Sequence, residues 1–318
     1  MTSSAGVGFC FDRTFPPALV TDVARRLEAG GADRLWIIED CFYTGGISLA
    51  AAALAVTERL SIGLGILPVV ARNPAITAME IATLIGLAPG RVLPGLGHGV
   101  QDWMGQMGVR PKSPLRALEE VIDAVRLLLE GETVTTDGEY VRLTDVRLDP
   151  PPAEAPPILA GVRGPKSLAL AGKVAGGIVL AEPSTPSTVR LALDQAGHPD
   201  DFVVAAFSSV CVQDDRATAY RIMAPWLGRN IEERNPSLVP VPFFDELTKL
   251  YADKGVDGLL TMPPEWWSEI GPIGTIDDAA AHLDVLADAG VHHVGLFPLA
   301  DVDLAMNQVD HVITLANR

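Results

Sequence analysis

Residues 61–99 read SIGLGILPVVARNPAITAMEIATLIGLAPGRVLPGLGHG, and this stretch decides the fold class. The apolar run at 61–67 predicts a strand, the segment 74–87 begins with a proline and predicts a helix, and 91–96 predicts the next strand. Two strands joined by a helix in this way lie parallel, because only a long crossover connects parallel neighbours. The stretch is therefore one unit of an α/β fold.

The same alternation continues on both sides of this unit. The other predicted strands lie at 7–11, 34–39, 158–160, 177–180, 202–212 and 294–297, nearly all separated by helical segments rich in alanine and leucine. Eight such units in 318 residues predict a (β/α)8 TIM barrel, an α/β fold, formed by one domain over 1–318. A doubly wound open sheet is the alternative, but the first turn after a strand, at 11–14, has no glycine-rich fingerprint.

Two insertions are expected on the rim of this barrel. Residues of about 132–148, with Asp137 and Gly138 at their centre, predict a β-hairpin. Residues of about 213–272 form a less regular insertion, with helices near 215–228 and 243–254 and a loop rich in proline and tryptophan at 262–272.

Composition excludes several classes of protein. With 48% hydrophobic residues the chain can build a large core, so it is not disordered. Its 24 basic and 40 acidic residues give a net charge of −16, which would repel nucleic acid. No apolar run is long enough to span a membrane, and the N-terminus does not resemble a signal peptide. The three scattered cysteines argue against a disulfide framework or a zinc site. We expect a cytoplasmic protein without a metal.

The active site of such a barrel forms where the strands end at their carboxyl side. The candidate residues at these ends are Asp12, Glu39, Asp40, Cys41, Gly65, Ile66, His98, Trp103, the loop 161–166 and Glu182. Glu39 and Asp40 are either solvated rim residues or a polar pair at the mouth. Because neighbours on a strand face opposite sides, at most one of them should face the mouth, and the pattern does not fix which.

Three further features each allow two interpretations. His98 lies between Gly97 and Gly99, so it either transfers a proton near a ligand or caps a turn. Residues 161–167 lead from a strand into a helix that begins at Pro165, which makes either an anion site or an ordinary turn. Trp266 either covers the pocket or anchors its own loop. The glycines of the strand 61–67 indicate a backbone or a flat ligand close by.

Several blocks resemble the bacterial luciferase-like superfamily, and more closely its deazaflavin (coenzyme F420) branch, which includes the methylenetetrahydromethanopterin reductases. The blocks follow the order of that family over almost the whole chain. They are TERLSIGLGI at 57–66, NPAITA at 73–78, GRV at 90–92, GLGHG at 95–99 with Trp103, GPKSL at 164–168 with LAG at 170–172, and ADAGV at 287–291.

The resemblance implies a TIM barrel that holds a tricyclic cofactor in its mouth. It implies a cis peptide between Gly65 and Ile66 against the ring, with Glu39 and His98 also at the cofactor. The cofactor phosphate is expected on the turn that includes Gly161, Val162, Gly164, Pro165 and Lys166. Many relatives carry an acidic residue and a histidine where this chain has Glu39 and Asp40. Their proton transfer therefore cannot be copied, and Asp40 or His98 is the expected proton carrier.

The function implied is hydride transfer between F420 and a small organic substrate containing a C=N, a C=C or a C=O/alcohol group. Asp12, Cys41, Trp103, Glu182 and Trp266 are expected to line the substrate pocket. An FMN-dependent monooxygenase of the same superfamily is the alternative, and a non-catalytic flavin-binding protein is a third possibility. Barrels of this kind often pair through exposed helices, so we expect a homodimer.

Overall fold

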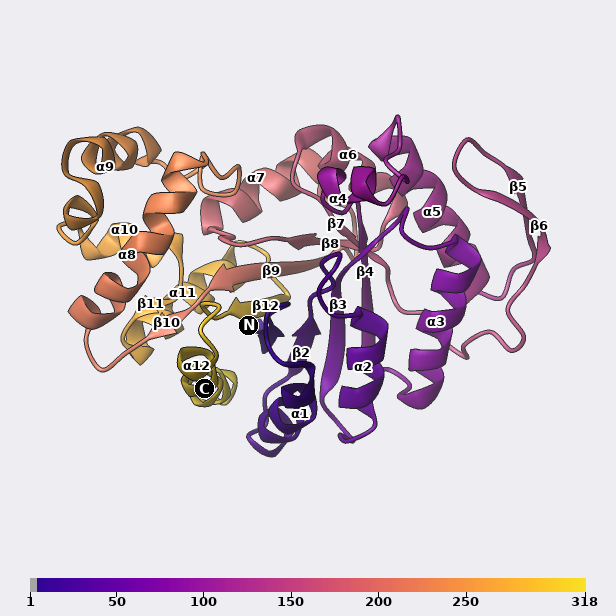
Figure 1. Cartoon of the computed structure of the whole chain (residues 1–318), viewed down its shortest axis with the longest axis horizontal. Coiled ribbons are helices and arrows are strands. Elements are labelled where there is room, and N and C mark those ends of the chain that lie inside the picture. Colours follow the sequence, from indigo (N-terminus) through magenta and orange to yellow (C-terminus); the bar gives the residue numbers. More distant parts are fainter. Residues whose placement is uncertain (1–4) are drawn as a thin grey trace.

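The computed structural model describes residues 5–318 and confirms the (β/α)8 barrel (Figure 1). Eight parallel strands close on themselves in the order β1-β12-β9-β8-β7-β4-β3-β2. They are β1 (Gly6–Phe11), β2 (Arg34–Ile37), β3 (Ser61–Pro68), β4 (Val92–Gly97), β7 (Leu159–Gly161), β8 (Gly177–Leu180), β9 (Val203–Ser209) and β12 (His293–Phe297). Because β1 pairs with both β2 and β12, the sheet has no free edge, which excludes the open doubly wound alternative.

Helices surround this barrel in the usual alternation. They are η1 (Pro17–Leu19), α1 (Val20–Ala29), α2 (Gly46–Leu54), α3 (Pro74–Leu87), α4 (Gln101–Gln106), α5 (Pro114–Leu129), α6 (Pro165–Val174), α7 (Pro186–Ala196), α8 (Arg216–Glu232), α9 (Phe244–Leu259), α10 (Pro264–Ile270), α11 (Ile276–Asp288) and α12 (Val302–Ala316). Within 5–318, no helix is both long and apolar enough to cross a membrane.

Helices that follow barrel strands begin at the mouth, and the sequence at these starts explains why they begin there. Asn73 precedes α3, and its side chain accepts a hydrogen bond from the N–H of Ala75 at 2.9 Å. Ser113 precedes α5, and its side-chain oxygen accepts a hydrogen bond from the N–H of Arg116. α3, α5 and α6 all have proline as their first residue, where a missing N–H costs nothing. The unpaired amides of these first turns therefore point toward the mouth.

The barrel interior is filled by aromatic rings that lie against glycines. Trp36 and Phe207 are fully or almost fully buried, and their rings meet edge to face with centroids 5.1 Å apart. A Cβ atom on Gly63 would lie 2.2 Å from the Trp36 ring, and one on Gly65 would lie 2.6 Å from Phe207 Cζ. The glycines of β3 thus make room for side chains of the barrel itself. The expectation of a backbone or a flat ligand at Gly63 is wrong.

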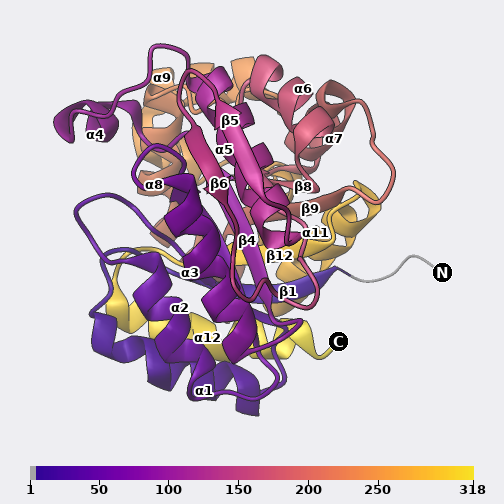
Figure 2. The same ribbon diagram turned by 90° about the vertical axis from the view of Figure 1, so that its right-hand side faces the viewer.

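The two insertions lie at opposite ends of the molecule (Figure 1). In the region of the predicted hairpin, β5 (Val134–Asp137) and β6 (Arg142–Val146) pair antiparallel outside α5 (Figure 2). At the other end, α8, α9, α10 and the short pair β10 (Cys211–Val212) and β11 (Ile273–Gly274) surround a second hydrophobic cluster that includes Trp267. The predicted loop at 262–272 is wrong, because residues 264–270 form α10.

Candidate active site

A cavity of about 550 Å³ opens at the mouth of the barrel, a volume typical of small-molecule sites. The ends of all eight strands contribute to its wall. The lining residues include Asp12, Arg13, Glu39, Asp40, Cys41, Gly65, Ile66, His98, Trp103, Gly161, Val162, Arg163, Gly164, Ser167, Glu182, Phe207 and Phe297.

The structure brings together most of the residues that the sequence singles out. Those at the cavity are Asp12, Glu39, Asp40, Cys41, Gly65, Ile66, His98, Trp103, Gly161, Val162, Gly164 and Glu182. Pro165, Lys166 and Trp266 do not line it. Pro165 is still the first residue of α6, and so it shapes the turn without reaching the cavity.

Trp266 packs against the second hydrophobic cluster and does not line the cavity. Its ring stacks on Phe243 with centroids 4.5 Å apart and an angle of 5° between the planes. The structure therefore corrects the placement of Trp266 in the substrate pocket and favours the anchoring interpretation. Proline at the first position of α10 starts a helix at this point, and the helix carries Trp266 to Phe243.

Glu39 and Asp40 both line the cavity, contrary to the expectation that at most one would. The reason is that β2 ends at Ile37, so the alternation of a strand no longer governs the two residues that follow Ile38. Glu39 is held by two partners. Its carboxylate accepts two hydrogen bonds from the Arg72 guanidinium, at 2.6 and 2.7 Å, and one from the N–H of Gly46 at 2.7 Å.

Asp40 forms an ion pair with Arg13, a residue that the sequence interpretation missed. The Arg13 guanidinium also lies 4.9 Å from the centroid of the Tyr43 ring and 5.7 Å from that of Trp103. Arg13 thus ties the carboxylate at the end of β2 to two aromatic residues of the rim. Sequence offers no signal for this pair, because its members are 27 positions apart.

His98 connects the end of β4 to the first turn of α6. Its Nε2 atom lies 3.0 Å from Ser167 Oγ, close enough for a hydrogen bond in either direction. Burial lowers the pKa of His98, so the imidazole is neutral at pH 7. The residue is therefore a neutral link between two parts of the cavity wall.

One wall of the cavity is built by Ile66, where β3 bulges out of register with β4. The peptide bond between Gly65 and Ile66 is cis, as the family resemblance implies. The Ile66 side chain lies over three glycines of β4 and β7. A Cβ atom would lie 3.1 Å from it at Gly95, 3.0 Å at Gly97 and 2.5 Å at Gly161. These glycines therefore set how deeply Ile66 sits.

The turn from β7 into α6 provides the features of an anion site. Gly164 precedes the helix in an extended conformation, and the first turn of α6 presents amides without partners inside the helix. Arg163, which lies within the candidate loop 161–166, also lines the cavity and adds a positive charge there. Lys166 was expected at the cofactor phosphate but does not line the cavity. Its side chain lies in a groove between α5 and α6 outside the mouth.

Glu182 follows β8, which stands opposite β2 in the closed barrel. Among residues 5–318, no side chain forms a hydrogen bond or an ion pair with its carboxyl group. Burial raises the pKa of Glu182. A hydrogen bond from its own N–H and the charge of Arg163 oppose this rise, and the nearby charges of Asp40 and Asp12 add to it. Glu182 therefore keeps its proton to a higher pH than an ordinary glutamate.

No group of three or more histidine, cysteine, aspartate or glutamate residues is placed to hold a metal ion in the part of the chain described, 5–318. The polar groups of the cavity include four carboxylates, two arginines, one imidazole, the Cys41 thiol and the Ser167 hydroxyl, and the first turn of α6 adds its amides. Such a set suits an organic ligand that carries an anionic group.

Comparison with known proteins agrees with this geometry. The model of the luciferase-like monooxygenase family matches residues 2–293. Over 221 residues, 67% of each chain, the sequence is 33% identical to 5,10-methylenetetrahydromethanopterin reductase from Methanolobus tindarius. The fold is similar to that of an F420-dependent secondary alcohol dehydrogenase in complex with an F420-acetone adduct, with a TM-score of 0.77, 22% identity and 99% of both chains covered.

It is also similar to the coenzyme F420-dependent tetrahydromethanopterin reductase from Methanopyrus kandleri. The TM-score is 0.76 and the identity is 20%, with 98% of this chain and 99% of that chain covered. These two likenesses concern the fold, whereas the family model spans most of the sequence itself. The chain therefore belongs to the luciferase-like monooxygenase family.

Proposed function

We propose that this protein is an F420-dependent oxidoreductase, which transfers a hydride between coenzyme F420 and a small organic substrate with a C=N, a C=C or a C=O/alcohol group. The observation that carries the proposal is the pairing of two features in one cavity. Ile66 forms a raised apolar wall, and the turn at 161–167 beside it offers amides and Arg163 to an anion. The names of both structural neighbours support the cofactor.

The residues present fit a tricyclic ring with a phosphate. Side chains at positions 97 and 161 would displace Ile66, so the glycines there keep the wall in place for the ring. The phosphate would be held by the amides of the first turn of α6 and by Arg163. A chain with a net charge of −16 needs such a local site to hold an anionic cofactor.

When bound, the cofactor supplies or accepts the hydride, and the protein positions the reacting groups. Ile66 would support one face of the ring, so the substrate would lie on the other face. Arg13 holds Asp40 beside Trp103, which keeps a polar group and an aromatic wall fixed at the rim. Fixed walls contribute by holding reactants in the geometry of attack and by excluding water.

The proton that accompanies the hydride would come from Glu182. Asp40 or His98 is the proton carrier expected from the sequence, but Asp40 is paired with Arg13, and His98 is neutral and tied to Ser167. Glu182 has no such partner, and burial favours its protonated form. During reduction a C=X group would gain the hydride on carbon and the Glu182 proton on X, and solvent would then restore the proton. Asp40 and His98 would act as positioning residues.

The test is a titration of the purified protein with oxidised F420 and, in parallel, with FMN, followed by fluorescence quenching. We expect saturable binding of F420 with a Kd at or below the micromolar range, and much weaker binding of FMN. A preference for FMN would instead support an FMN-dependent monooxygenase. Binding of neither cofactor would support a non-catalytic protein and contradict the anion site at 161–167.

We also propose that the chain forms a homodimer through α3. Most residues of this helix are apolar, and three of its large apolar side chains are exposed: Ile76, Met79 and Leu87. Light scattering on a sizing column should give twice the chain mass of 33.7 kDa. Met79→Glu should shift the mass toward that of one chain, whereas Val285→Glu on α11, which is 42% exposed against 49% for Met79, should not. A single-chain mass for the unaltered protein would contradict the proposal.

A further inference from the structure

The peptide group between Ala181 and Glu182 is directly connected to the carboxyl group of Glu182. Its N–H donates a hydrogen bond to that carboxyl group, so the orientation of the peptide sets the orientation of the carboxyl. Its C=O, which belongs to Ala181, points the other way, because a trans peptide is planar with the two groups on opposite sides. A contact that holds this C=O therefore also orients the carboxyl group of Glu182.

Two serine hydroxyls donate hydrogen bonds to the C=O of Ala181. The Oγ atom of Ser184 lies 3.2 Å from the carbonyl oxygen, and that of Ser237 lies 3.3 Å from it. Ser184 shares its single hydroxyl hydrogen with the C=O of Leu180, at 3.1 Å. Within residues 5–318, the hydroxyl of Ser237 has no second acceptor. Both serines are buried, and a buried hydroxyl that loses its partner costs free energy, so the contact of Ser237 is firmly held.

Ser237 belongs to the insertion that contains α8, α9 and α10, where it lies between α8 and α9. The first turn of α7 fastens this insertion at two points. Thr188 Oγ1 donates a hydrogen bond to the C=O of Ser237 at 2.6 Å, and the N–H and hydroxyl of Ser187 donate to the Glu269 carboxylate at 3.2 and 2.6 Å. Since α7 follows β8, the insertion is bound to the same segment that carries Glu182.

Resting on the proposed function, in which Glu182 supplies the proton, we propose that Ser237 is a positioning residue for this step. Its hydroxyl fixes the peptide group between Ala181 and Glu182, and this peptide fixes the carboxyl group. Ser237 itself does not line the cavity. The insertion thereby takes part in the reaction without contact with the cofactor or the substrate.

The titration of Glu182 is sensitive to this contact. A hydrogen bond to the C=O of a peptide makes its N–H a stronger donor, because linked hydrogen bonds polarise one another. A stronger N–H donor stabilises the ionised carboxylate, so the loss of the Ser237 hydroxyl should raise the pKa of Glu182. We expect a shift of about half a pH unit. The other titratable and charged side chains near Glu182 stay the same in this variant: Cys10, Asp12, Asp40 and Arg163.

The experiment follows the carboxyl stretch of protonated Glu182 by infrared difference spectroscopy during a pH titration, and Glu182→Gln identifies the band by its loss. This measurement needs neither the cofactor nor a substrate. Ser237→Ala removes the hydroxyl and keeps the backbone contact with Thr188. Ser237→Thr restores a hydroxyl, and the cavity of about 40 Å³ that Ser237 lines has room for the added methyl group.

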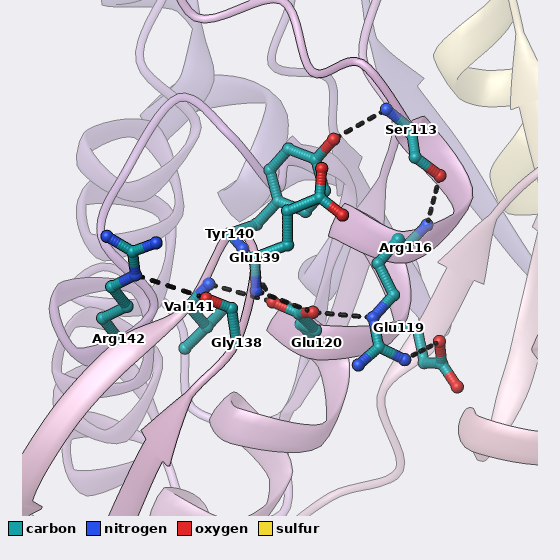
Figure 3. Close-up of polar contacts among 9 residues, drawn as sticks. All are labelled: Ser113, Arg116, Glu119, Glu120, Gly138, Glu139, Tyr140, Val141 and Arg142. Carbon is teal, nitrogen blue, oxygen red and sulfur yellow. Dashed lines mark hydrogen bonds and ion pairs between the residues drawn. The ribbon is translucent and has the colours of Figure 1, made fainter.

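The matched control removes a hydroxyl that fastens the other insertion. Figure 3 shows the β5–β6 hairpin against α5, where the Glu120 carboxylate accepts a hydrogen bond from the N–H of Tyr140 at 2.8 Å. The hydroxyl oxygen of Tyr140 accepts one from the N–H of Ser113 at 2.7 Å. Tyr140→Phe therefore removes one hydroxyl between an insertion and the barrel, as Ser237→Ala does, but it leaves the peptide of Glu182 untouched.

We expect the titration of Glu182 to move to higher pH in Ser237→Ala and to stay unchanged in Ser237→Thr and Tyr140→Phe. The reduction of cyclohexanone, cyclohexenone or 1-pyrroline by reduced F420 gives a second measurement. The kcat of Ser237→Ala should be about threefold to tenfold lower than that of the unaltered protein, the usual effect of one hydrogen bond. In the Glu182→Gln background the same substitution should cause no further loss.

An unmoved titration in Ser237→Ala would overturn the proposal, as would an equal shift in Tyr140→Phe. An equal loss of kcat with and without Glu182 would also overturn it, because Ser237 would then act on another group. Failure of F420 to bind, or of all three probes to react, would instead count against the proposed function. The infrared titration depends on neither and would still decide the role of Ser237.

Discussion

Replacing Gly161 by aspartate is expected to weaken the binding of coenzyme F420 by about a hundredfold, which corresponds to about 2.7 kcal/mol. Two effects add. A Cβ atom at this position would lie 2.5 Å from Ile66 Cγ2, so the side chain that supports the ring must move. The new carboxylate would also face the phosphate across the turn, where like charges repel. The measurement is the Kd of oxidised F420 by fluorescence quenching.

Three variants separate bulk from charge. Gly161→Ala adds only the clash with Ile66, so it should weaken F420 binding less than Gly161→Asp does. Gly164→Asp adds only the charge, because a Cβ atom at Gly164 would meet nothing within 4 Å. Gly164→Ala adds neither and should bind like the unaltered protein, since the φ of −82° at this residue suits alanine. An unchanged Kd for Gly161→Asp would place the phosphate elsewhere.

Replacing Glu182 by glutamine is expected to lower kcat by about 10²- to 10⁴-fold, the usual contribution of a positioned acid or base. The affinity for F420 should change little, because glutamine keeps the size of the side chain and a protonated Glu182 carries no charge, even though β8 lies beside β7 and Arg163 of the turn lies near Glu182. Oxidation of reduced F420 would be followed with a ketone, an enone and a cyclic imine as probes, and kcat compared on each probe that turns over.

The pH profile distinguishes proton transfer from a structural role. Reduction needs protonated Glu182, so the rate should fall as the pH rises through its pKa, which burial raises. Glu182→Gln cannot titrate and should lose this limb of the profile. The titratable and charged side chains near Glu182 are Cys10, Asp12, Asp40 and Arg163.

Asp40→Asn and His98→Gln serve as the matched controls. Both variants should change KM or the rate. The fall of the rate with rising pH should remain, because both residues position other groups and do not supply the proton. If the limb persists in Glu182→Gln and is lost in Asp40→Asn or His98→Gln, the proton comes from that residue.

The fold was predictable because its signals are local and repeated. Each barrel strand is a short apolar run followed by a helical segment, and the order of eight such units fixes the topology. The prediction of secondary structure is wrong where one residue type is common in two kinds of structure. Pro264 in a segment rich in proline suggested a loop, but proline is also a favoured first residue of a helix, and α10 begins there. The short α4 and the C-terminal α12 also escaped the sequence interpretation.

The site was predictable as a set of strand ends, but not as a network. Each strand end could be read from its own segment, which is why Asp12, Asp40, His98 and Glu182 were singled out. Their partners depend on tertiary distance. Glu39 and Arg72 are 33 positions apart, and His98 and Ser167 are 69 apart. The side of α6 on which the Lys166 side chain lies depends on how the helix is rotated about its axis, and the few residues around Lys166 do not determine that rotation.

The contact of Ile66 with the glycines of β4 and β7 limits the order in which this chain can change. Positions 66 and 161 share one small volume, so a methyl group gained at 161 requires volume lost at 66. A larger residue at 161 therefore displaces the wall unless 66 loses volume at the same time. A redesign of the cofactor wall must treat the two positions as one.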